Sequence, residues 1–155
     1  MAAAEVAPYV RPPNASAFWN HHQAQGAGGD NLPHNHVQCT FVMLVGLPRT
    51  LIHERMAIAW SDFLVKPLKP CVDVCLGLGL DQGSNHAVDD IRVTSWSQLT
   101  DAIAHLQPLA ALNSVKKDSW SKQTLCFNVM ANVERAVSPH RRYDWAIVTR
   151  PDILL

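Results

Sequence analysis

Two short apolar segments that flank a stretch of helical periodicity constrain the fold of this chain more than any other feature. The segments Cys39–Val45 and Cys71–Gly77 are apolar, rich in valine and leucine, and almost free of charge, as is typical of strands buried on both faces. A turn follows the first segment, and we expect Thr50 to cap the helix after it, which Pro67 ends. The order strand, helix, strand predicts two parallel strands joined by a right-handed crossover. The helix is expected to bury Ile52, Met56, Ala59, Trp60 and Phe63.

The rest of the chain continues this alternation. Ser95 and Gln98 form a capping-box pattern ahead of a short amphipathic helix. Apolar side chains at helical spacing, from Cys126 to Val137, predict a further helix, and Tyr143–Thr149 reads as the final strand. Alternating strands and helices predict an α/β fold with an open, mostly parallel sheet and flanking helices.

Two segments between these elements carry weak patterns. Ile91–Thr94 is expected to be a short edge strand, and residues 107–121 are expected to be irregular. Residues 1–37 contain prolines, a glycine cluster and several of the histidines, with no apolar periodicity, so we expect a flexible leader there. The folded domain is then expected to span 38–155.

Composition excludes several function classes. The formal net charge is zero, so the sequence predicts no nucleic-acid partner. No apolar run reaches the roughly 18 residues that a membrane-spanning helix needs. Without a visible secretory signal, the default expectation is a cytoplasmic protein, in which the four cysteines are buried thiols.

Ligands of open parallel sheets bind beyond the carboxyl ends of the strands, where loops and helix N-termini converge. No Gly-x-Gly-x-x-Gly or phosphate-loop motif follows a strand, which argues against dinucleotide binding, and no nucleophile motif supports hydrolase chemistry. The polar residues that do lie at or near these ends are Gly46 and Arg49 for the first strand, Asp73 and Asp81 for the second, and Arg150 and Asp152 for the last.

Each of these residues has a functional and a structural interpretation. Gly46 would let the backbone approach a ligand and Arg49 would bind a phosphate, or the turn simply leads into a helix with a solvated arginine. Asp152, held by the preceding proline, would bind Mg²⁺ or Mn²⁺ beside Arg150, or the two form a surface ion pair. Asp73 would contact a ligand or satisfy neighbouring backbone groups.

Several ordered landmarks resemble a family of glycosyltransferase-like proteins from algae, bacteria and large algal viruses. They span the whole predicted domain: the segment Phe41–Thr50, the lead Lys66–Leu68 into Val72–Val74, Asn128, and Tyr143–Asp152. In that family an opening strand ends in a glycine and an arginine. A closing "YD-strand-RxRPD" segment carries an aspartate that resembles the DxD motif of GT-A nucleotide-sugar transferases.

The resemblance implies a GT-A or Rossmann-like fold that binds a nucleotide-sugar donor and transfers a hexosyl group. Asp152 would coordinate Mn²⁺ or Mg²⁺ on the diphosphate, and Gly46, Arg49, Asp73 and Arg150 would bind the nucleotide sugar; no catalytic residue is implied. Because acceptor-side residues of such folds follow this segment, the resemblance also implies a domain truncated at its C-terminus and inactive in this form.

Two alternatives stay open at this stage. The chain could be a noncatalytic α/β interaction or packing module with an unfinished sheet edge that a partner completes. It could also be a metal-binding protein that acts through the histidines of residues 1–37.

Overall fold

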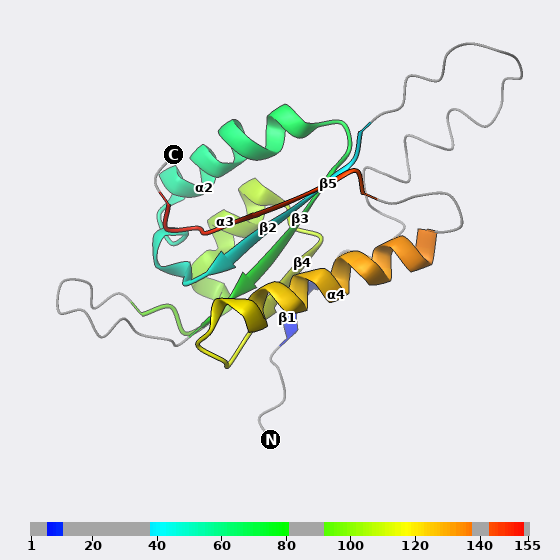
Figure 1. Cartoon of the computed structure of the whole chain (residues 1–155). Helices are drawn as coiled ribbons and strands as arrows, with labels where there is room; N and C mark the ends of the chain where they lie inside the picture. Colours follow the sequence, from blue (N-terminus) through cyan, green and yellow to red (C-terminus); the bar gives the residue numbers. More distant parts are fainter. Residues whose placement is uncertain (1–5, 11–37, 81–91, 138–142, 154–155) are drawn as a thin grey trace, which may run out of the picture.

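The computed structural model describes residues 6–10, 38–80, 92–137 and 143–153. These residues form one sheet with the strand order β1-β4-β3-β2-β5 (Figure 1). Neighbouring strands from β4 to β5 run parallel, and β1 pairs antiparallel with β4. The prediction of an α/β fold with a mostly parallel sheet is therefore confirmed. The strands are β1 Val6–Val10, β2 Thr40–Gly46, β3 Val72–Leu78, β4 Ala110–Asn113 and β5 Trp145–Thr149.

In the described part of the chain, three α-helices cover the two faces of the sheet. The elements α2 (Glu54–Trp60) and α3 (Thr100–Leu106) pack against each other, and α4 (Ser119–Val137) packs on β2, β3 and β4. Figure 1 shows α2 and α4 on opposite sides of the sheet. Short turns of other helix types complete these elements: 3-10 turns at Pro48–Thr50, Lys66–Leu68 and Trp96–Leu99, and a π-helical turn at Ser61–Val65.

The path of the chain creates a topological switch point at β2. From β2 the chain moves through α2 to β3 and through α3 to β4, and then crosses back by α4 to β5 on the other side of β2. Right-handed crossovers in opposite directions place their helices on opposite faces, as the two layers of this molecule require. The strand order thus reverses at β2, and open α/β sheets bind ligands beyond the carboxyl ends of the strands at such a point.

Alternating side chains of β2 divide the core into two apolar layers. Val42 and Leu44 pack with α2 and α3, in a cluster that includes Trp60. Phe41 and Met43 face the other way, toward residues of α4. The strand is buried on both faces, which explains why its sequence is continuously apolar rather than alternating.

Two expectations about short strands are wrong. The stretch 107–121 is not irregular throughout, because it contains β4, which pairs with β3 and β1. Alanine and asparagine are poor strand formers, so the strand state of Ala110–Asn113 comes from its two neighbours rather than from propensity. Residues 92–94, the described part of the expected edge strand at Ile91–Thr94, lie outside the sheet.

The first helix also differs from expectation. It begins at Glu54 rather than after Thr50, whose hydroxyl instead donates to the carbonyl of Pro151. Phe63, expected on the buried face, is 74% exposed, because the helix changes to π-helical geometry at Ser61 and its side chains rotate out of register. By contrast, the capping box of Ser95 and Gln98 is confirmed.

The four cysteines are buried, but they are not thiols. Cys39 pairs with Cys71 and Cys75 with Cys126, so the expectation of free cysteines is wrong. The spacing of the cysteines along the chain does not indicate either pair. Cys39 and Cys71 meet because β2 and β3 are parallel neighbours, and Cys75 and Cys126 meet because α4 packs on β3. Within the described residues no helix combines the length and the apolar character needed to cross a bilayer.

Candidate anion site at the switch point

The turn after β2 and the turn after β5 meet at the carboxyl edge of the sheet. Gly46 ends β2 with φ +152°, a conformation that side chains with a Cβ rarely adopt. A Cβ on Gly46 would lie 3.3 Å from Cδ of Pro151. Glycine is therefore required by both the backbone conformation and the close approach of the two turns.

Hydrogen bonds fix the turn after β5 to the connection between β2 and α2. The carbonyl oxygen of Pro151 accepts one bond from Oγ1 of Thr50 (2.6 Å) and one from Nε1 of Trp60 (3.3 Å). The amide of Ile153 donates to the carbonyl of Arg150 and closes the turn. The anchoring role of Thr50 and Trp60 has no signal in the sequence, because an N-cap pattern and an apolar helix face account for both residues.

Two guanidinium groups converge on one carboxylate in this turn. Arg150 donates from Nε to Oδ1 of Asp152 (3.0 Å) and from Nη2 to Oδ2 (2.7 Å), which is a bidentate fork. Nη2 of Arg49 lies 3.6 Å from the same Oδ2. The Asp152 side chain is only 8% exposed, whereas Arg49 is 30% and Arg150 63% exposed. The cluster carries two positive charges and one negative charge, with the arginines on the solvent side.

The electrostatics of the cluster follow from this geometry. Burial of the Asp152 side chain acts to raise its pKa, but hydrogen bonds and the positive charge of Arg150, with a contribution from Arg49, outweigh burial and hold the pKa below its usual value. The same contacts raise the pKa of Arg150. The carboxylate is therefore ionised at neutral pH, and the guanidinium groups beside it are of the kind that binds an anion such as a phosphate.

The donor set fits a divalent cation poorly. Both oxygens of Asp152 already accept hydrogen bonds from Arg150, and a second cation, Arg49, lies beside them. No group of three or more His, Cys, Asp or Glu side chains able to hold a metal occurs within the described residues. A metal ion at Asp152 would have to displace one arginine and approach the other, so the expectation of Mn²⁺ or Mg²⁺ at Asp152 gains no support from this arrangement.

Asp73 does not join this cluster. It is the second residue of β3, near the amino edge of the sheet, and its side chain is buried. Its Oδ2 accepts a 2.6 Å hydrogen bond from the hydroxyl of Tyr143, just before β5. Of the sequence-predicted site residues, Gly46, Arg49, Arg150 and Asp152 thus lie together, and Asp73 lies at the opposite edge. Asp81 and the histidines of residues 1–37 lie outside the described residues.

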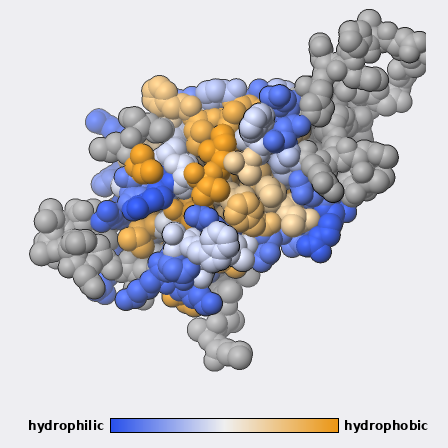
Figure 2. Space-filling model, viewed as in Figure 1, coloured by the Kyte–Doolittle hydropathy of each residue, from blue (hydrophilic) through white to orange (hydrophobic). Residues whose placement is uncertain are grey.

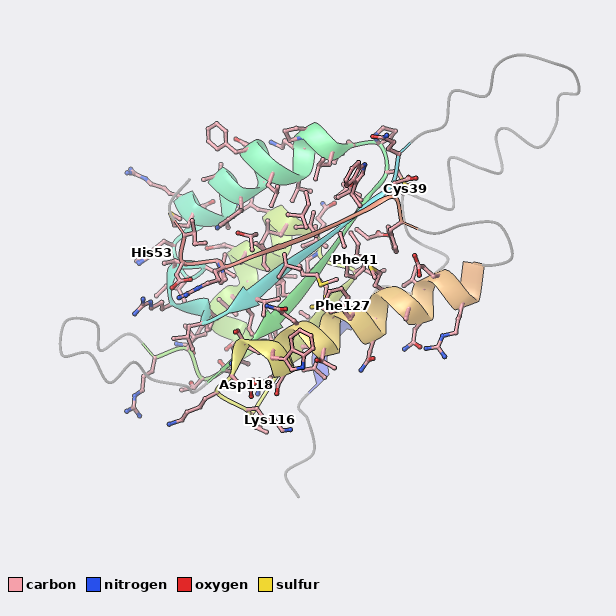
Figure 3. The ribbon with its side chains drawn as sticks, in the orientation of Figure 1. Cys39, Phe41, His53, Lys116, Asp118 and Phe127 are labelled. Atoms are coloured by element: carbon pink, nitrogen blue, oxygen red, sulfur yellow. A yellow bond between two sulfur atoms is a disulfide. The ribbon has the colours of Figure 1, made fainter. Side chains whose placement is uncertain are left out.

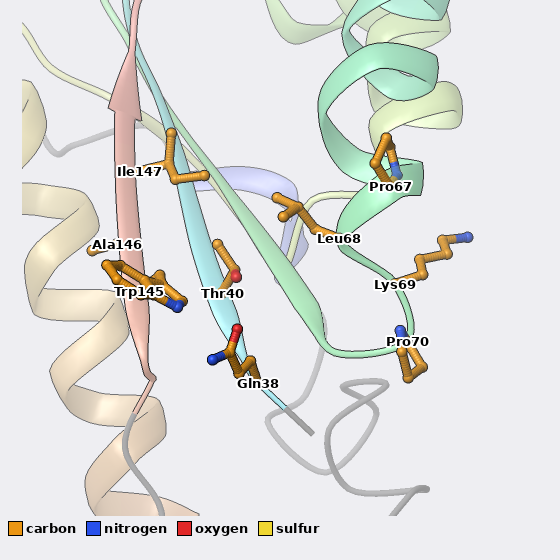
Figure 4. Close-up of a pocket in the computed structure, with 9 residues that line it drawn as sticks. All are labelled: Gln38, Thr40, Pro67, Leu68, Lys69, Pro70, Trp145, Ala146 and Ile147. Atoms are coloured by element: carbon orange, nitrogen blue, oxygen red, sulfur yellow. The ribbon is translucent and has the colours of Figure 1, made fainter. Parts of the chain in front are cut away.

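Two hollows lined by described residues lie away from the switch point. One, of about 440 Å³, is at the amino edge between β5 and the segment that leads into β3; its nine lining residues are labelled in Figure 4. The other, of about 460 Å³, adjoins the first turn of α4 and is lined by the exposed Trp120, close to the turn that carries Lys116 and Asp118 (Figure 3).

Side chains at the start of α4 hydrogen-bond to backbone groups of its first turn and of the segment before it. Asp118 accepts the amide N–H of Ser121, and the buried Lys122 donates from Nζ to the carbonyls of Lys116 and Lys117. Burial lowers the pKa of Lys122. These contacts stabilise the turn and give its charged groups structural partners.

Comparison of the chain with protein-family models, curated proteins and solved structures gives no significant match.

Proposed function

We propose that the chain binds a nucleotide-sugar donor at the carboxyl edge of its sheet. Arg49 and Arg150 hold the diphosphate, and Gly46 lets the turn that carries Arg150 pack closely against the end of β2. The observation that supports this proposal is the convergence of two guanidinium groups at the switch point between β2 and β5. Bidentate guanidinium groups match the geometry of phosphate oxygens, and the partly exposed Arg150 can turn from Asp152 to a ligand.

Hexosyl transfer is the reaction that the glycosyltransferase resemblance suggests for such a site. Negative charge grows on the departing nucleoside diphosphate in this reaction, and two fixed arginines would stabilise it. The proposal assigns no catalytic base, and it contains no step through a metal ion, because the arginines already occupy the carboxylate.

Removal of either arginine tests the proposal. Arg49→Gln and Arg150→Gln should each weaken binding of UDP-glucose or GDP-mannose by about 10- to 100-fold, the effect of losing a charge-assisted hydrogen bond. Binding is measured by calorimetry and by thermal stabilisation, since a ligand of the folded state raises its stability. Arg55→Gln, a matched change at an exposed arginine of α2, should leave affinity unchanged. Equal affinity in all three variants would refute the assignment.

Asp152→Asn separates an arginine site from a metal site. If the arginines bind the diphosphate, removal of the competing carboxylate charge should leave affinity unchanged or increase it, with or without Mn²⁺. If Asp152 instead holds Mn²⁺ or Mg²⁺, binding should depend on the metal and should be lost in this variant.

A noncatalytic interaction module is the second candidate function. It is favoured by one observation, the exposed apolar strand β5 at the edge of the sheet. This candidate predicts no stabilisation by any nucleotide sugar.

A further inference from the structure

The strand β5 forms an open edge of the sheet. Within the described residues it pairs only with β2, on one side. Its backbone groups on the other side therefore form a row that can hydrogen-bond another strand.

The side chains of β5 are apolar and poorly covered. Trp145 is 60% exposed and Val148 41% exposed, although large apolar side chains are usually buried. Figure 2 shows apolar side chains gathered over the part of the surface where Figure 1 places β5. The strand contains no charge, proline or bulge between Trp145 and Thr149, so it lacks the features by which proteins usually protect an edge.

The residues that flank β5 carry opposite charges. Asp144 precedes the strand, and its Oδ2 accepts a hydrogen bond from the backbone N–H of Cys39 (2.7 Å). Arg150 follows the strand, and both residues are exposed. If two copies of the strand pair antiparallel about Ile147, Asp144 of each copy lies opposite Arg150 of the other. Shifting the pairing by two residues removes this match, because Asp144 then faces Val148 in one direction and Asp152 in the other.

The side chains in the same register also complement each other. Trp145 lies opposite Thr149 of the second copy on one face, and Ala146 lies opposite Val148 on the other. Aromatic residues opposite β-branched ones, and oppositely charged pairs, are favourable cross-strand neighbours. Because the guanidinium group has five N–H donors, Arg150 can keep its fork on Asp152 while it faces a second carboxylate.

We propose that this chain forms a two-fold homodimer by antiparallel pairing of β5 with β5 of a second copy, centred on Ile147. A two-fold axis brings the same patch of both copies together and closes the assembly. The β5 edge of each copy is then paired with the other. The paired strands are short, so the dimer is reversible, with a Kd of about 1–100 µM. The dimer does not depend on the nucleotide-sugar proposal, although Arg150 takes part in both.

Sedimentation velocity of the full chain tests the dimer. Over about 1–500 µM the protein should pass from monomer to dimer, without larger species. Val148→Lys places a charge on the edge and should weaken dimerisation at least about tenfold. Val115→Lys, the same substitution at a 71% exposed valine outside the sheet, should have no effect. Matching far-ultraviolet spectra and melting curves ensure that each variant is folded.

Cross-linking tests the register. The described chain has no free cysteine, so an introduced thiol is the single target for a short bis-maleimide. An equal mixture of Ala146→Cys and Val148→Cys proteins should cross-link much faster than either protein alone, because these two positions face each other.

A protein that is monomeric throughout the concentration range would overturn the proposal. Equal effects of Val148→Lys and Val115→Lys, or equal cross-linking of the mixture and the single variants, would overturn the strand pairing. A ladder of larger assemblies would indicate head-to-tail contact between different surfaces instead of a two-fold interface.

Discussion

At the scale of single residues, Asp152 makes the stability of the carboxyl edge dependent on pH. Its folded pKa lies below the ordinary value of 3.8, mainly because the pull of Arg150 outweighs burial. A carboxyl group with a depressed pKa stabilises the fold above its unfolded pKa, and this stabilisation disappears as pH falls through the folded pKa. The contribution should therefore be complete at neutral pH and lost progressively below about pH 4.

Urea denaturation of the wild-type protein and of Asp152→Asn checks this expectation. The wild type should have the larger free energy of unfolding at pH 7, and the difference should shrink as pH falls below about 4, because the protonated carboxyl resembles the amide. A difference that stays constant across this range would show that the carboxylate charge does not stabilise the turn.

The contact between Tyr143 and Asp73 gives a second test at this scale. The hydroxyl donates at 2.6 Å to a carboxylate that is almost fully buried, and burial together with the negative charge of Asp73 raises the pKa of Tyr143 strongly. Tyr143→Phe should lower the free energy of unfolding by about 1–3 kcal/mol, because a buried charged acceptor loses a donor. The ring contact with Phe41, at 5.0 Å between centroids, is retained in this variant. Chemical denaturation measures the loss, and no change would contradict the structural role of the pair.

At the scale of elements, Gly77 determines how closely α4 approaches β3. A Cβ at this position would lie 2.8 Å from the carbonyl oxygen of Lys122 and 3.2 Å from Sγ of Cys126. Backbone cannot move aside as a flexible side chain can, so Gly77→Ala should displace the helix and cost about 1–3 kcal/mol. Thermal denaturation measures this loss. An unchanged melting temperature for Gly77→Ala would contradict the tight contact. Gly46→Ala adds the same atom at the carboxyl edge of the sheet, and it should also weaken binding of the proposed ligand.

The elements that were predictable from sequence are those with a strong pattern of their own. The strand β2 is continuously apolar, and the 3-10 turn that leads into α3 begins at a capping box, so both are predictable from sequence. The strand β4 could not, because Ala110–Asn113 has no strand propensity and pairs only because β3 and β1 lie beside it. The exposure of Phe63 could not be predicted either, because the spacing of apolar residues does not indicate a local change to π-helical geometry.

At the scale of the whole molecule, the two disulfides should dominate stability. They close loops with sequence separations of 32 and 51 residues. Chain-entropy estimates give about 3–4 kcal/mol for each. Reduction should therefore lower the urea midpoint sharply or unfold the protein. Thiol titration of the denatured chain should find no free thiol before reduction and four after it; four thiols in the untreated protein would contradict both pairs.

Disulfides persist mainly in oxidising compartments, so these pairs favour such an environment over the cytoplasmic default.

The spacing of the cysteines did not predict the disulfides, because contacts between residues far apart in the chain have no local pattern. The candidate site depends on contacts of the same kind. Its individual members could be proposed from the ends of strands, but the hydrogen bond from Thr50 to Pro151 joins residues 101 positions apart. The separation of Asp73 from the cluster likewise follows from its position in β3, which the sequence alone does not reveal.

The pair Cys39–Cys71 joins the beginnings of β2 and β3, whereas the arginine cluster lies where β2 and β5 end. The disulfide and the proposed ligand site thus lie at opposite edges of the same sheet. Replacing both cysteines of this bridge with serine should loosen the edge of the sheet that lies away from the proposed nucleotide-sugar site. If that site binds a nucleotide sugar, its affinity should stay near normal at temperatures where the variant remains folded. Thermal stability and the proposed ligand binding would then be adjustable separately in this protein.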